Sequence, residues 1–373
     1  MKRILCDANP MCYGSSSALL SITDHLHAHL TAIAQGVTAE LLSRDPRIQH
    51  VEPIDPKDAQ AVAHYLRRAS FDAVLVVSNQ NNIPCYAAAG LPIFFVDILY
   101  WYSARKDQDV WAAATQTFVQ NFPGVPERLQ EQRHPGPPPC LVGPLIRPAS
   151  QASGDQGGTL VNLGGGRSRW IEPGVNTSYP SVIAQLLDAL GDDLPEPLLV
   201  AGGAQIIREL QRHLQRPARC ESLPQREFIQ ALAGCQRYLT APGLNAVFEG
   251  MQARKTVSFL PPQNASQIFQ LARYEDAGLL PKGLNLPELQ PLASFPALDR
   301  VQDERAVTEL VLEALRALDQ DPPAMQRLVQ HTRAQLHQAH EAREAQERFL
   351  AALGPLGGPT IARHMEEHLA DQP

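Results

Sequence analysis

Short apolar runs alternate with helix-like patterns along the first part of the chain. Residues 71–77 read FDAVLVV, a continuous apolar run that is typical of a parallel strand buried on both faces. Similar short runs predict strands at residues 4–6, 91–96, 117–120 and 140–142, and helical patterns cover residues 15–30 and 86–89. This repeated alternation predicts a parallel sheet with helices on both faces.

A break in composition separates this part from a second alternating part. Residues 135–139 are rich in proline, and residues 148–158 are rich in Ser, Gly and Gln, which is typical of linkers. Strand patterns then recur at residues 159–163, 197–201, 237–240 and 256–260, with helical patterns at 179–190, 208–214, 224–233, 244–253, 268–277, 304–318 and 323–353. We therefore expect an α/β protein with doubly wound parallel-sheet domains over residues 1–148 and 149–353. A tail over residues 354–373 contains an amphipathic segment at 361–369.

Composition narrows the class of protein. The 373 residues carry a formal net charge of −7, with 44% hydrophobic and 19% charged residues. This is a globular composition, and its acidity argues against a nucleic-acid partner. No run reaches the roughly 18 apolar residues of a membrane span. Six scattered cysteines without a CxxC pair, and a start too short in apolar residues for a signal peptide, favour a reduced, cytoplasmic protein.

Glycines follow several predicted strands of the second part. They occur at 164–166, 202–203 and 243. At the carboxyl end of a parallel strand, glycine lets a phosphate approach the backbone, and the next helix N-terminus supplies N–H donors. The alternative for each segment is a tight strand-to-helix turn without a ligand.

The most informative segment joins the predicted strand 237–240 to the next helix. Gly243 and Asn245 fall at the turn, where a diphosphate would lie, and Glu249 is six residues beyond Gly243. A carboxylate there can accept both hydroxyls of a ribose, unless it is a solvated helix residue. The amides of residues 263–267 suit sugar hydroxyls, which need donors and acceptors, or form a polar loop that caps the following helix.

The second half resembles the donor domain of GT-B glycosyltransferases, in particular plant secondary-product enzymes and the peptidoglycan N-acetylglucosaminyl transferase. Residues 243–249 match the G-x-N-x-x-x-E core of the plant signature, and Gln267 matches its sugar-binding glutamine. Residues 161–165, 199–203 and 223–232 resemble the two glycine loops and the uracil-reading segment. The resemblance implies two facing Rossmann-like domains with a helical C-terminal extension, and a UDP-sugar donor in the cleft between the domains. Its donor-binding residues are Gly164, Gly165, Gly202, Gly203, Phe228, Gly243, Leu244, Asn245, Glu249, Gln263, Asn264 and Gln267.

The sequence departs from this family at its catalytic positions. Ala241 stands where the plant enzymes have a phosphate-binding histidine and the peptidoglycan enzyme an arginine. The loop at residues 9–17 lacks the histidine base of both families. Inverting transfer needs a base near the acceptor, and Asp7 and Asp97, each at a predicted strand end, are the candidates unless they are structural caps.

The first domain is expected to bind the acceptor. The candidate acceptor residues are Tyr13, Gly14, Ser15, Asn79 and Trp101. The loop at residues 13–16 is faintly similar to that of cytosylglucuronate synthases, which implies a nucleobase or another specialised metabolite as the small-molecule acceptor. An aromatic lid over the core is the alternative for Trp101.

Other polar clusters favour no additional cofactor. His25, His27 and His29 fall in the helical pattern of residues 15–30, and only His25 and His29 would share its face, without a third metal ligand. The D-x-D segments at 107–109 and 319–321 follow no apolar strand, so we expect them on the surface. The nucleotide sugar is then a co-substrate, and no metal is required. Two alternatives remain: a GT-B nucleotide-sugar epimerase, and a catalytically silent homologue that activates a partner.

Overall fold

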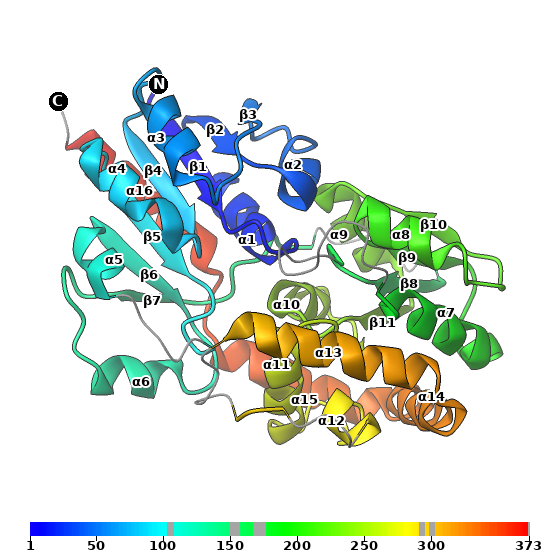
Figure 1. Ribbon diagram of the computed structural model, residues 1–373. Coiled ribbons are helices and arrows are strands. Elements are labelled where there is room, and N and C mark those ends of the chain that lie inside the picture. Colours follow the sequence, from blue (N-terminus) through cyan, green and yellow to red (C-terminus); the bar gives the residue numbers. More distant parts are fainter. Residues whose placement is uncertain (103–107, 150–156, 167–176, 291–294, 298–302, 372–373) are drawn as a thin grey trace. The chain divides into compact units, whose positions relative to one another are not determined.

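The computed structural model describes residues 1–102, 108–149, 157–166, 177–290, 295–297 and 303–371. The chain forms two compact units, each containing one sheet (Figure 1). The first unit comprises Met1–Arg147 and Leu353–Pro373, and the second Pro148–Ala352. The boundary lies one residue before the predicted one. Among the described residues, no helix is long and apolar enough to cross a membrane.

The first unit is built on a seven-stranded parallel sheet in the order β3-β2-β1-β4-β5-β6-β7. Its strands are β1 Arg3–Ala8, β2 His29–Ile33, β3 His50–Glu52, β4 Ala73–Val77, β5 Ile93–Asp97, β6 Gln116–Gln120 and β7 Cys140–Val142. The sequence pattern predicted five of these strands and missed β2 and β3. The strand order reverses between β1 and β4, the position at which open parallel sheets bind ligands.

The helices of the first unit correct one prediction. They are α1 Gly14–Thr23, α2 Gly36–Leu42, α3 Ala59–Leu66, η1 Gln80–Asn82, α4 Ile83–Ala88, α5 Gln108–Ala113, α6 Val125–Glu131 and α16 Gly357–Ala370. The predicted helix over residues 15–30 was wrong in its second half, because α1 ends at Thr23 and His29 begins β2. His25 and His29 therefore do not share a helix face. The pair of metal ligands on one helix that the pattern allowed is not formed.

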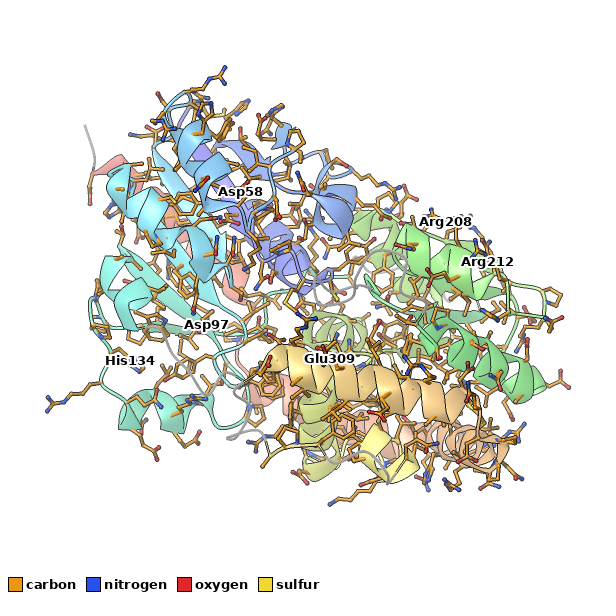
Figure 2. The ribbon with its side chains drawn as sticks, in the orientation of Figure 1. Asp58, Asp97, His134, Arg208, Arg212 and Glu309 are labelled. Atoms are coloured by element: carbon orange, nitrogen blue, oxygen red, sulfur yellow. The ribbon has the colours of Figure 1, made fainter. Side chains whose placement is uncertain are left out.

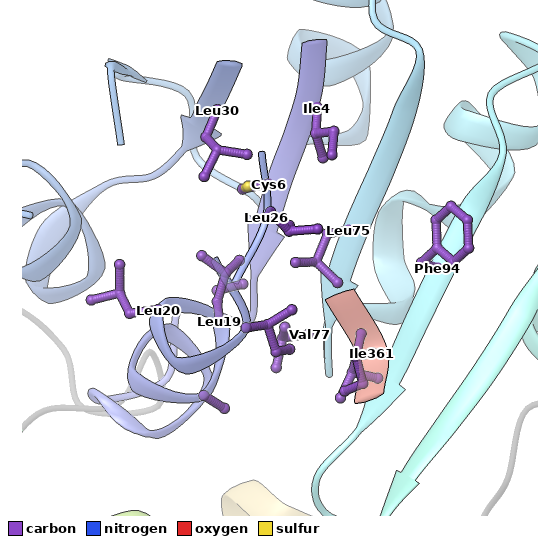
Figure 3. Close-up of a cluster of buried hydrophobic side chains, with 14 of the residues drawn as sticks. Ile4, Cys6, Leu19, Leu20, Leu26, Leu30, Leu75, Val77, Phe94 and Ile361 are labelled. Carbon is purple, nitrogen blue, oxygen red and sulfur yellow. The ribbon is translucent and has the colours of Figure 1, made fainter. Parts of the chain in front are cut away.

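One face of this sheet carries a continuous apolar core. Alternate residues of β1 and β4, such as Cys6 and Leu75, point to the same side, as the two-residue period of a strand requires. Leu19 of α1 and Ile361 of α16 pack against them (Figure 3). The two helices, one from each end of the chain, thus cover the same face of the sheet.

The C-terminal segment is therefore part of the first unit and not a separate tail. The backbone at Gly143 approaches the segment before α16 so closely that a Cβ there would lie 1.9 Å from the Pro355 carbonyl oxygen. The amide of Gly357 donates to the Pro144 carbonyl at 3.0 Å. Glycine is required at Gly143 because any side chain would separate the two backbones.

A buried arginine fixes the point where the chain leaves the first unit. Arg147 is 4% exposed, and its guanidinium donates to both carboxylate oxygens of Asp24, at 2.7 and 2.8 Å. A further N–H bonds the carboxylate of Asp45, which is itself buried. These contacts raise the pKa of Arg147 against the opposing effect of burial. The arrangement uses the planar fork of arginine, which a lysine cannot reproduce.

The second unit contains a five-stranded parallel sheet in the order β10-β9-β8-β11-β12. Its strands are β8 Thr159–Asn162, β9 Leu198–Ala201, β10 Arg219–Glu221, β11 Arg237–Thr240 and β12 Val257–Phe259. The sequence pattern missed β10, a three-residue edge strand. The unpaired edge of β12 is closed by side chains, because Gln346 bonds both backbone groups of Val257 and Gln335 accepts from the Phe259 amide at 2.8 Å.

The helices of the second unit largely follow the predicted pattern. They are α7 Tyr179–Leu190, η2 Gly191–Asp193, α8 Ala204–Leu210, α9 Gln225–Gly234, α10 Leu244–Gln252, α11 Ala265–Asp276, α12 Leu286–Leu289, α13 Glu304–Asp319, α14 Pro322–His337 and α15 Ala339–Ala352. The helical stretch predicted over residues 323–353 is divided, because α14 ends at His337 and α15 begins at Ala339.

A buried carboxyl near the end of α11 predicts a pH-dependent stability. Glu275 is 8% exposed, and burial, together with the nearby Glu288, raises the pKa of its side chain to about 7. The positive charge of Lys282 and a bond from the Gly283 backbone oppose this rise. Because the folded protein holds this proton more tightly than the unfolded chain, the stabilisation is complete below pH 4.5 and is lost as pH rises through about 7.

We therefore expect Glu275→Gln to flatten this dependence. The variant should gain about 1–3 kcal/mol of unfolding free energy relative to the wild-type protein at pH 8 compared with pH 5. Thermal unfolding of both proteins between pH 5 and pH 8 measures the difference. The exposed Glu344→Gln variant is the control. Parallel pH profiles for the wild-type protein and Glu275→Gln would contradict the assignment.

Candidate functional site

The glycine turns of the second unit pack directly on one another. Gly164 has a φ of +63°, and its carbonyl oxygen accepts a bond from the Gly203 amide at 2.9 Å. A Cβ at Gly203 would lie 2.7 Å from the Gly165 carbonyl oxygen, and one at Gly202 would lie 3.2 Å from that of Gly164. The glycines thus allow two strand-end loops to touch, which places the backbones after β8 and β9 side by side.

Two glutamines join this pair of turns to the loop after β12. The Gln263 side-chain amide donates to the Leu163 carbonyl at 2.8 Å, and its backbone amide donates to Gln267 Oε1 at 3.0 Å. A Cβ on Gly243 would lie 3.6 Å from Gln267 Nε2. The structure therefore brings Gly164, Gly243, Gln263 and Gln267 to one edge of the sheet, from three different strand ends.

The N-terminus of α10 also lies at this edge. Gly243 is its N-cap residue, without a side chain to cap the helix, and Leu244 and Asn245 are the first two helical residues. The first-turn N–H groups of a helix have no carbonyl partner inside that helix, and they carry the positive end of its dipole. Asn245 is 7% exposed. This terminus is therefore suited to an anionic group.

The carboxylate of Glu249 lies deeper on the same helix. Glu249 is 4% exposed, which corrects the alternative of a solvated surface residue. Gln225, the first residue of α9, donates to Glu249 Oε1 at 3.2 Å. Phe228, one turn further along α9, is 9% exposed, with its ring centroid 6.5 Å from that of Tyr238. Helices α9 and α10 thus meet at a buried, ordered carboxylate.

Asn264 caps the helix that follows it. It is the N-cap of α11, and its Oδ1 accepts bonds from the Gln267 amide at 3.1 Å and from the Ser266 hydroxyl at 3.0 Å. This oxygen caps α11 and orients Gln267, so Asn264 positions a residue of the strand edge. The alternative reading, a polar loop that caps the following helix, holds for this residue.

In the first unit, Asp7 is the centre of a closed hydrogen-bond cluster. The side chain at the end of β1 is fully buried. Asn79 donates to its Oδ1 at 2.8 Å, while Asn82 and Tyr86 donate to its Oδ2 at 2.9 and 2.7 Å. Burial raises the pKa of Asp7, and these three bonds and the charge of Lys57 counteract that rise. The geometry is that of a structural carboxylate, and it argues against Asp7 as a base.

Asn79 belongs to the same cluster and is also committed to the protein. Its amide nitrogen donates to Asp7 and to the Pro56 carbonyl at 3.0 Å, and its oxygen accepts from Lys57 at 2.6 Å. The structure therefore argues against Asn79 as an acceptor ligand. Asp97, which is labelled in Figure 2, ends β5. Its Oδ1 accepts a bond from the Leu99 amide at 3.0 Å. It remains the candidate base.

The remaining acceptor candidates lie in two places at the carboxyl edge of the first sheet. Tyr13 is the N-cap of α1, Gly14 is exposed and Ser15 is 6% exposed. Trp101 follows β5 and is 6% exposed, with its ring centroid 4.8 Å from that of Phe122. Ser78, at the end of β4, has a φ of +55°, a conformation that non-glycine residues adopt at some cost.

The structure fully describes only the second of the two D-x-D segments. Asp107 of the first D-x-D segment lies outside the described residues. Asp319 ends α13 and Asp321 caps α14, so the second segment is a helix connection. Within the described residues, no group of three His, Cys, Asp or Glu side chains is placed to hold a metal ion.

Comparison with known proteins supports the fold class. No family model matches the chain, and no curated protein matches its sequence. Solved structures do match. Arabidopsis thaliana UGT89C1 with UDP has a TM-score of 0.55 at 14% identity, covering 99% of this chain and 100% of that one. A Polygonum tinctorium UDP-glucosyltransferase capable of glucosylating indoxyl has a TM-score of 0.51 at 13% identity, covering 99% and 98%.

A third match is a UDP-glucose:anthocyanidin 3-O-glucosyltransferase with UDP, with a TM-score of 0.50 at 10% identity, covering 100% of this chain and 99% of that one. These matches extend over the whole chain and are structures of GT-B type. The chain therefore has the GT-B fold, two parallel-sheet units with a helical C-terminal region, and the predicted fold class is confirmed.

The sequence did not predict which side chains orient the candidate residues, although the segment 223–232 contains Gln225. Gln225 contacts Glu249 from a helix that begins 24 residues earlier in the chain. Asn82, Tyr86 and Lys57 enclose the Asp7 side chain and its partner Asn79. None of these residues follows a glycine turn, and only the proximity of neighbouring strand ends in space brings them to the site.

Proposed function

We propose that this protein is a glycosyltransferase that moves a sugar from a UDP-linked donor to a small-molecule acceptor. The observation that carries the proposal is the buried Glu249 carboxylate, 4% exposed, on the helix whose N-terminus is Gly243. Gly243 and Gln267 lie together at the strand edge, so one helix offers an anion site and a diol acceptor in series. A nucleoside diphosphate sugar has these groups in that order.

Different residues along this edge of the sheet would bind different parts of the donor. The diphosphate lies against the α10 N-terminus and the glycine turns, where backbone N–H groups stabilise the charge that develops on the leaving group. Glu249, oriented by Gln225, accepts the ribose hydroxyls. Gln263 and Gln267 would form hydrogen bonds with the hydroxyls of the donor sugar. Structural relatives that share the fold, Arabidopsis thaliana UGT89C1 and the anthocyanidin 3-O-glucosyltransferase, were solved with UDP, which supports UDP as the nucleotide.

The acceptor would bind at the carboxyl edge of the first sheet, near Tyr13, Ser15 and Trp101. We assign the base to Asp97, because the Asp7 carboxylate is enclosed by its own partners. A nucleobase or another small aromatic metabolite fits the aromatic side chains there. The Polygonum relative glucosylates indoxyl, a small aromatic acceptor. An epimerase would share the donor residues and have no use for this aromatic edge.

The proposed nucleotide specificity is tested by thermal shift. We expect UDP and UDP-sugars to raise the melting temperature more than ADP, GDP or NAD at equal concentration, since specific ligands stabilise the folded state by mass action. A ligand at about 100 times its Kd adds about 2.7 kcal/mol of stability. Stronger stabilisation by NAD would move the chain to a dehydrogenase class. UDP binding without turnover of any donor would favour the silent homologue.

A second expectation concerns metal ions. Sugar transfer should survive EDTA, because the α10 N-terminus and backbone N–H groups take the place of a cation at the diphosphate. The measurement is initial rate with and without chelator at saturating UDP-sugar, with a manganese-dependent transferase as positive control for chelation. Loss of activity that manganese or magnesium restores would contradict this arrangement and return attention to the D-x-D segment at residues 107–109.

A further inference from the structure

Several polar atoms at the carboxyl edge of the first sheet are buried without a hydrogen-bond partner in the described part of the chain. The clearest case is Gln120, the last residue of β6, which is 1% exposed and has neither Oε1 nor Nε2 bonded. The indole Nε1 of Trp101, Asn9 Oδ1 and Ser16 Oγ are likewise buried and form no hydrogen bond with the described residues. Buried amides are rarely left with both groups unsatisfied, so each such group needs an explanation.

The Asp7 cluster at the same edge provides a contrast. There, Asn79, Asn82 and Tyr86 complete the carboxylate of Asp7, and Pro56 accepts the remaining amide hydrogens. Side chains alternate along a strand, so Gln120 lies on the opposite face from Val119 and on the same face as Phe118, a member of the apolar core. Within the described residues, the fold thus satisfies the Asp7 carboxylate fully and leaves the Gln120 amide without a hydrogen-bond partner.

Two aromatic residues follow the paired strands β5 and β6. Phe122 comes two residues after Gln120, and its ring centroid is 4.8 Å from that of Trp101. The Asn121 amide donates to the Val142 carbonyl at 2.7 Å, which keeps the chain paired to β7 between Gln120 and Phe122. Strands β5 and β6 pair with Asp97 opposite Val119, so Gln120 ends one strand and Trp101 follows the carboxyl end of its neighbour. The Gln120 amide and the Trp101 indole, both without a hydrogen-bond partner among the described residues, therefore belong to the ends of two neighbouring strands of one sheet.

We propose that Gln120 and Trp101 form the specificity site for the acceptor, and that the acceptor is a small planar heterocycle with an amide-type edge. Such an edge places an N–H donor beside a carbonyl or ring-nitrogen acceptor, the pattern that a glutamine side chain pairs with in two parallel bonds. Trp101 supplies a further donor and, with Phe122, the stacking surface. This inference rests on the proposed transferase function and narrows its acceptor class.

A matched set of ring compounds tests the edge recognition. The probes are 2-pyridone, which has the amide edge, N-methyl-2-pyridone, which lacks the N–H, and phenol, which lacks both ring groups. We expect ligand-observed NMR to show binding of 2-pyridone about 10-fold or more tighter than binding of the other two. Equal binding of all three, or binding of none, would overturn the proposal. UDP binding, measured separately on the same protein, reports on the transferase function itself.

The Gln120→Met variant separates a ligand site from a structural role. Met is similar in length and apolar, so it removes two unsatisfied polar groups without opening a cavity. We expect its melting temperature to equal or exceed that of the wild-type protein, while 2-pyridone binding falls about 10- to 100-fold and UDP binding stays unchanged. Gln116→Met, in the same strand, is the control, because Gln116 Nε2 bonds the Thr117 and Pro138 carbonyls, so this variant should lose stability and keep its ligand affinity.

Two results would overturn the proposal. A lower melting temperature for Gln120→Met with unchanged 2-pyridone affinity would assign the Gln120 amide to a buried water molecule of the fold. Unchanged affinity at unchanged stability would exclude Gln120 from acceptor binding. If UDP binds in both proteins, either result leaves the transferase function standing and removes only the amide-edge specificity.

Discussion

We expect the Glu249→Ala variant to bind UDP about 10- to 150-fold more weakly than the wild-type protein, which corresponds to losing about 1.5–3 kcal/mol from hydrogen bonds to a charged group. The proposed role of Glu249 is to accept the two ribose hydroxyls, and alanine leaves them without a charged partner. Calorimetric titration with UDP, alongside the melting temperature of both proteins, measures the effect.

Burial of Glu249 requires a second variant. Because the side chain is 4% exposed and accepts a bond from Gln225, alanine also removes a contact between α9 and α10. Glu249→Gln keeps the size of the side chain and one acceptor oxygen, so it should fold normally and show an intermediate loss of affinity. Glu227→Ala, on the exposed face of α9, is the matched control and should change neither property. Full UDP affinity in a folded Glu249→Ala protein would remove the donor site as proposed.

We expect Arg147→Met to lower the unfolding free energy of the first unit by about 3–5 kcal/mol, the usual cost of breaking a buried ion pair by removing one partner. The substitution leaves Asp24 and the buried Asp45 without their shared counter-ion. Urea unfolding followed by tryptophan fluorescence measures the change in a Trp170→Phe background, in which the two remaining tryptophans, Trp101 and Trp111, belong to the first unit.

Two further variants assign the cause of that loss. Arg147→Lys should recover only part of the stability, because one ammonium group cannot reproduce three separate N–H bonds in a planar fork. Adding Asp24→Asn and Asp45→Asn to Arg147→Met should recover stability, since uncharged side chains need no counter-ion. The exposed Arg343→Met variant, which breaks only the pair with Glu347, should change stability by about 0.5 kcal/mol or less. A loss of that small size for Arg147→Met would show that the buried contacts contribute little.

The long, regular elements could be predicted from the sequence because their signal is local. Strand β11 and helix α7 were predicted with the bounds that the structure gives, Arg237–Thr240 and Tyr179–Leu190. A buried parallel strand is a continuous apolar run, and a helix of twelve residues shows its period several times. Strands β3 and β10 contain too few residues for a period, and the start of β2 lay inside the helical pattern predicted over residues 15–30.

Most candidate donor residues could be proposed from the sequence because they follow a predicted strand end in a parallel sheet, whereas Phe228 follows β10, which the pattern missed. What the sequence does not contain is how each polar atom is satisfied. Asn264 and Asn79 have the same side chain as a ligand-binding asparagine, and only their partners in space show that one caps α11 and the other holds Asp7. Contacts between residues 72 or more positions apart leave no local pattern in the chain.

The sequence by itself thus determined the alternation of strands and helices, the division near residue 148, and the order of glycine, amide and carboxylate along α10 and the neighbouring loops. The tertiary structure decided which of these groups are buried and which side chains form hydrogen bonds with them. It buried Glu249 beside Gln225, enclosed Asp7 and joined the last segment of the chain to the first unit. Among the described residues, it also left the Gln120 amide without a hydrogen-bond partner. The physical reason is that periodicity reports which face of an element is apolar, whereas hydrogen-bond satisfaction depends on which distant elements meet.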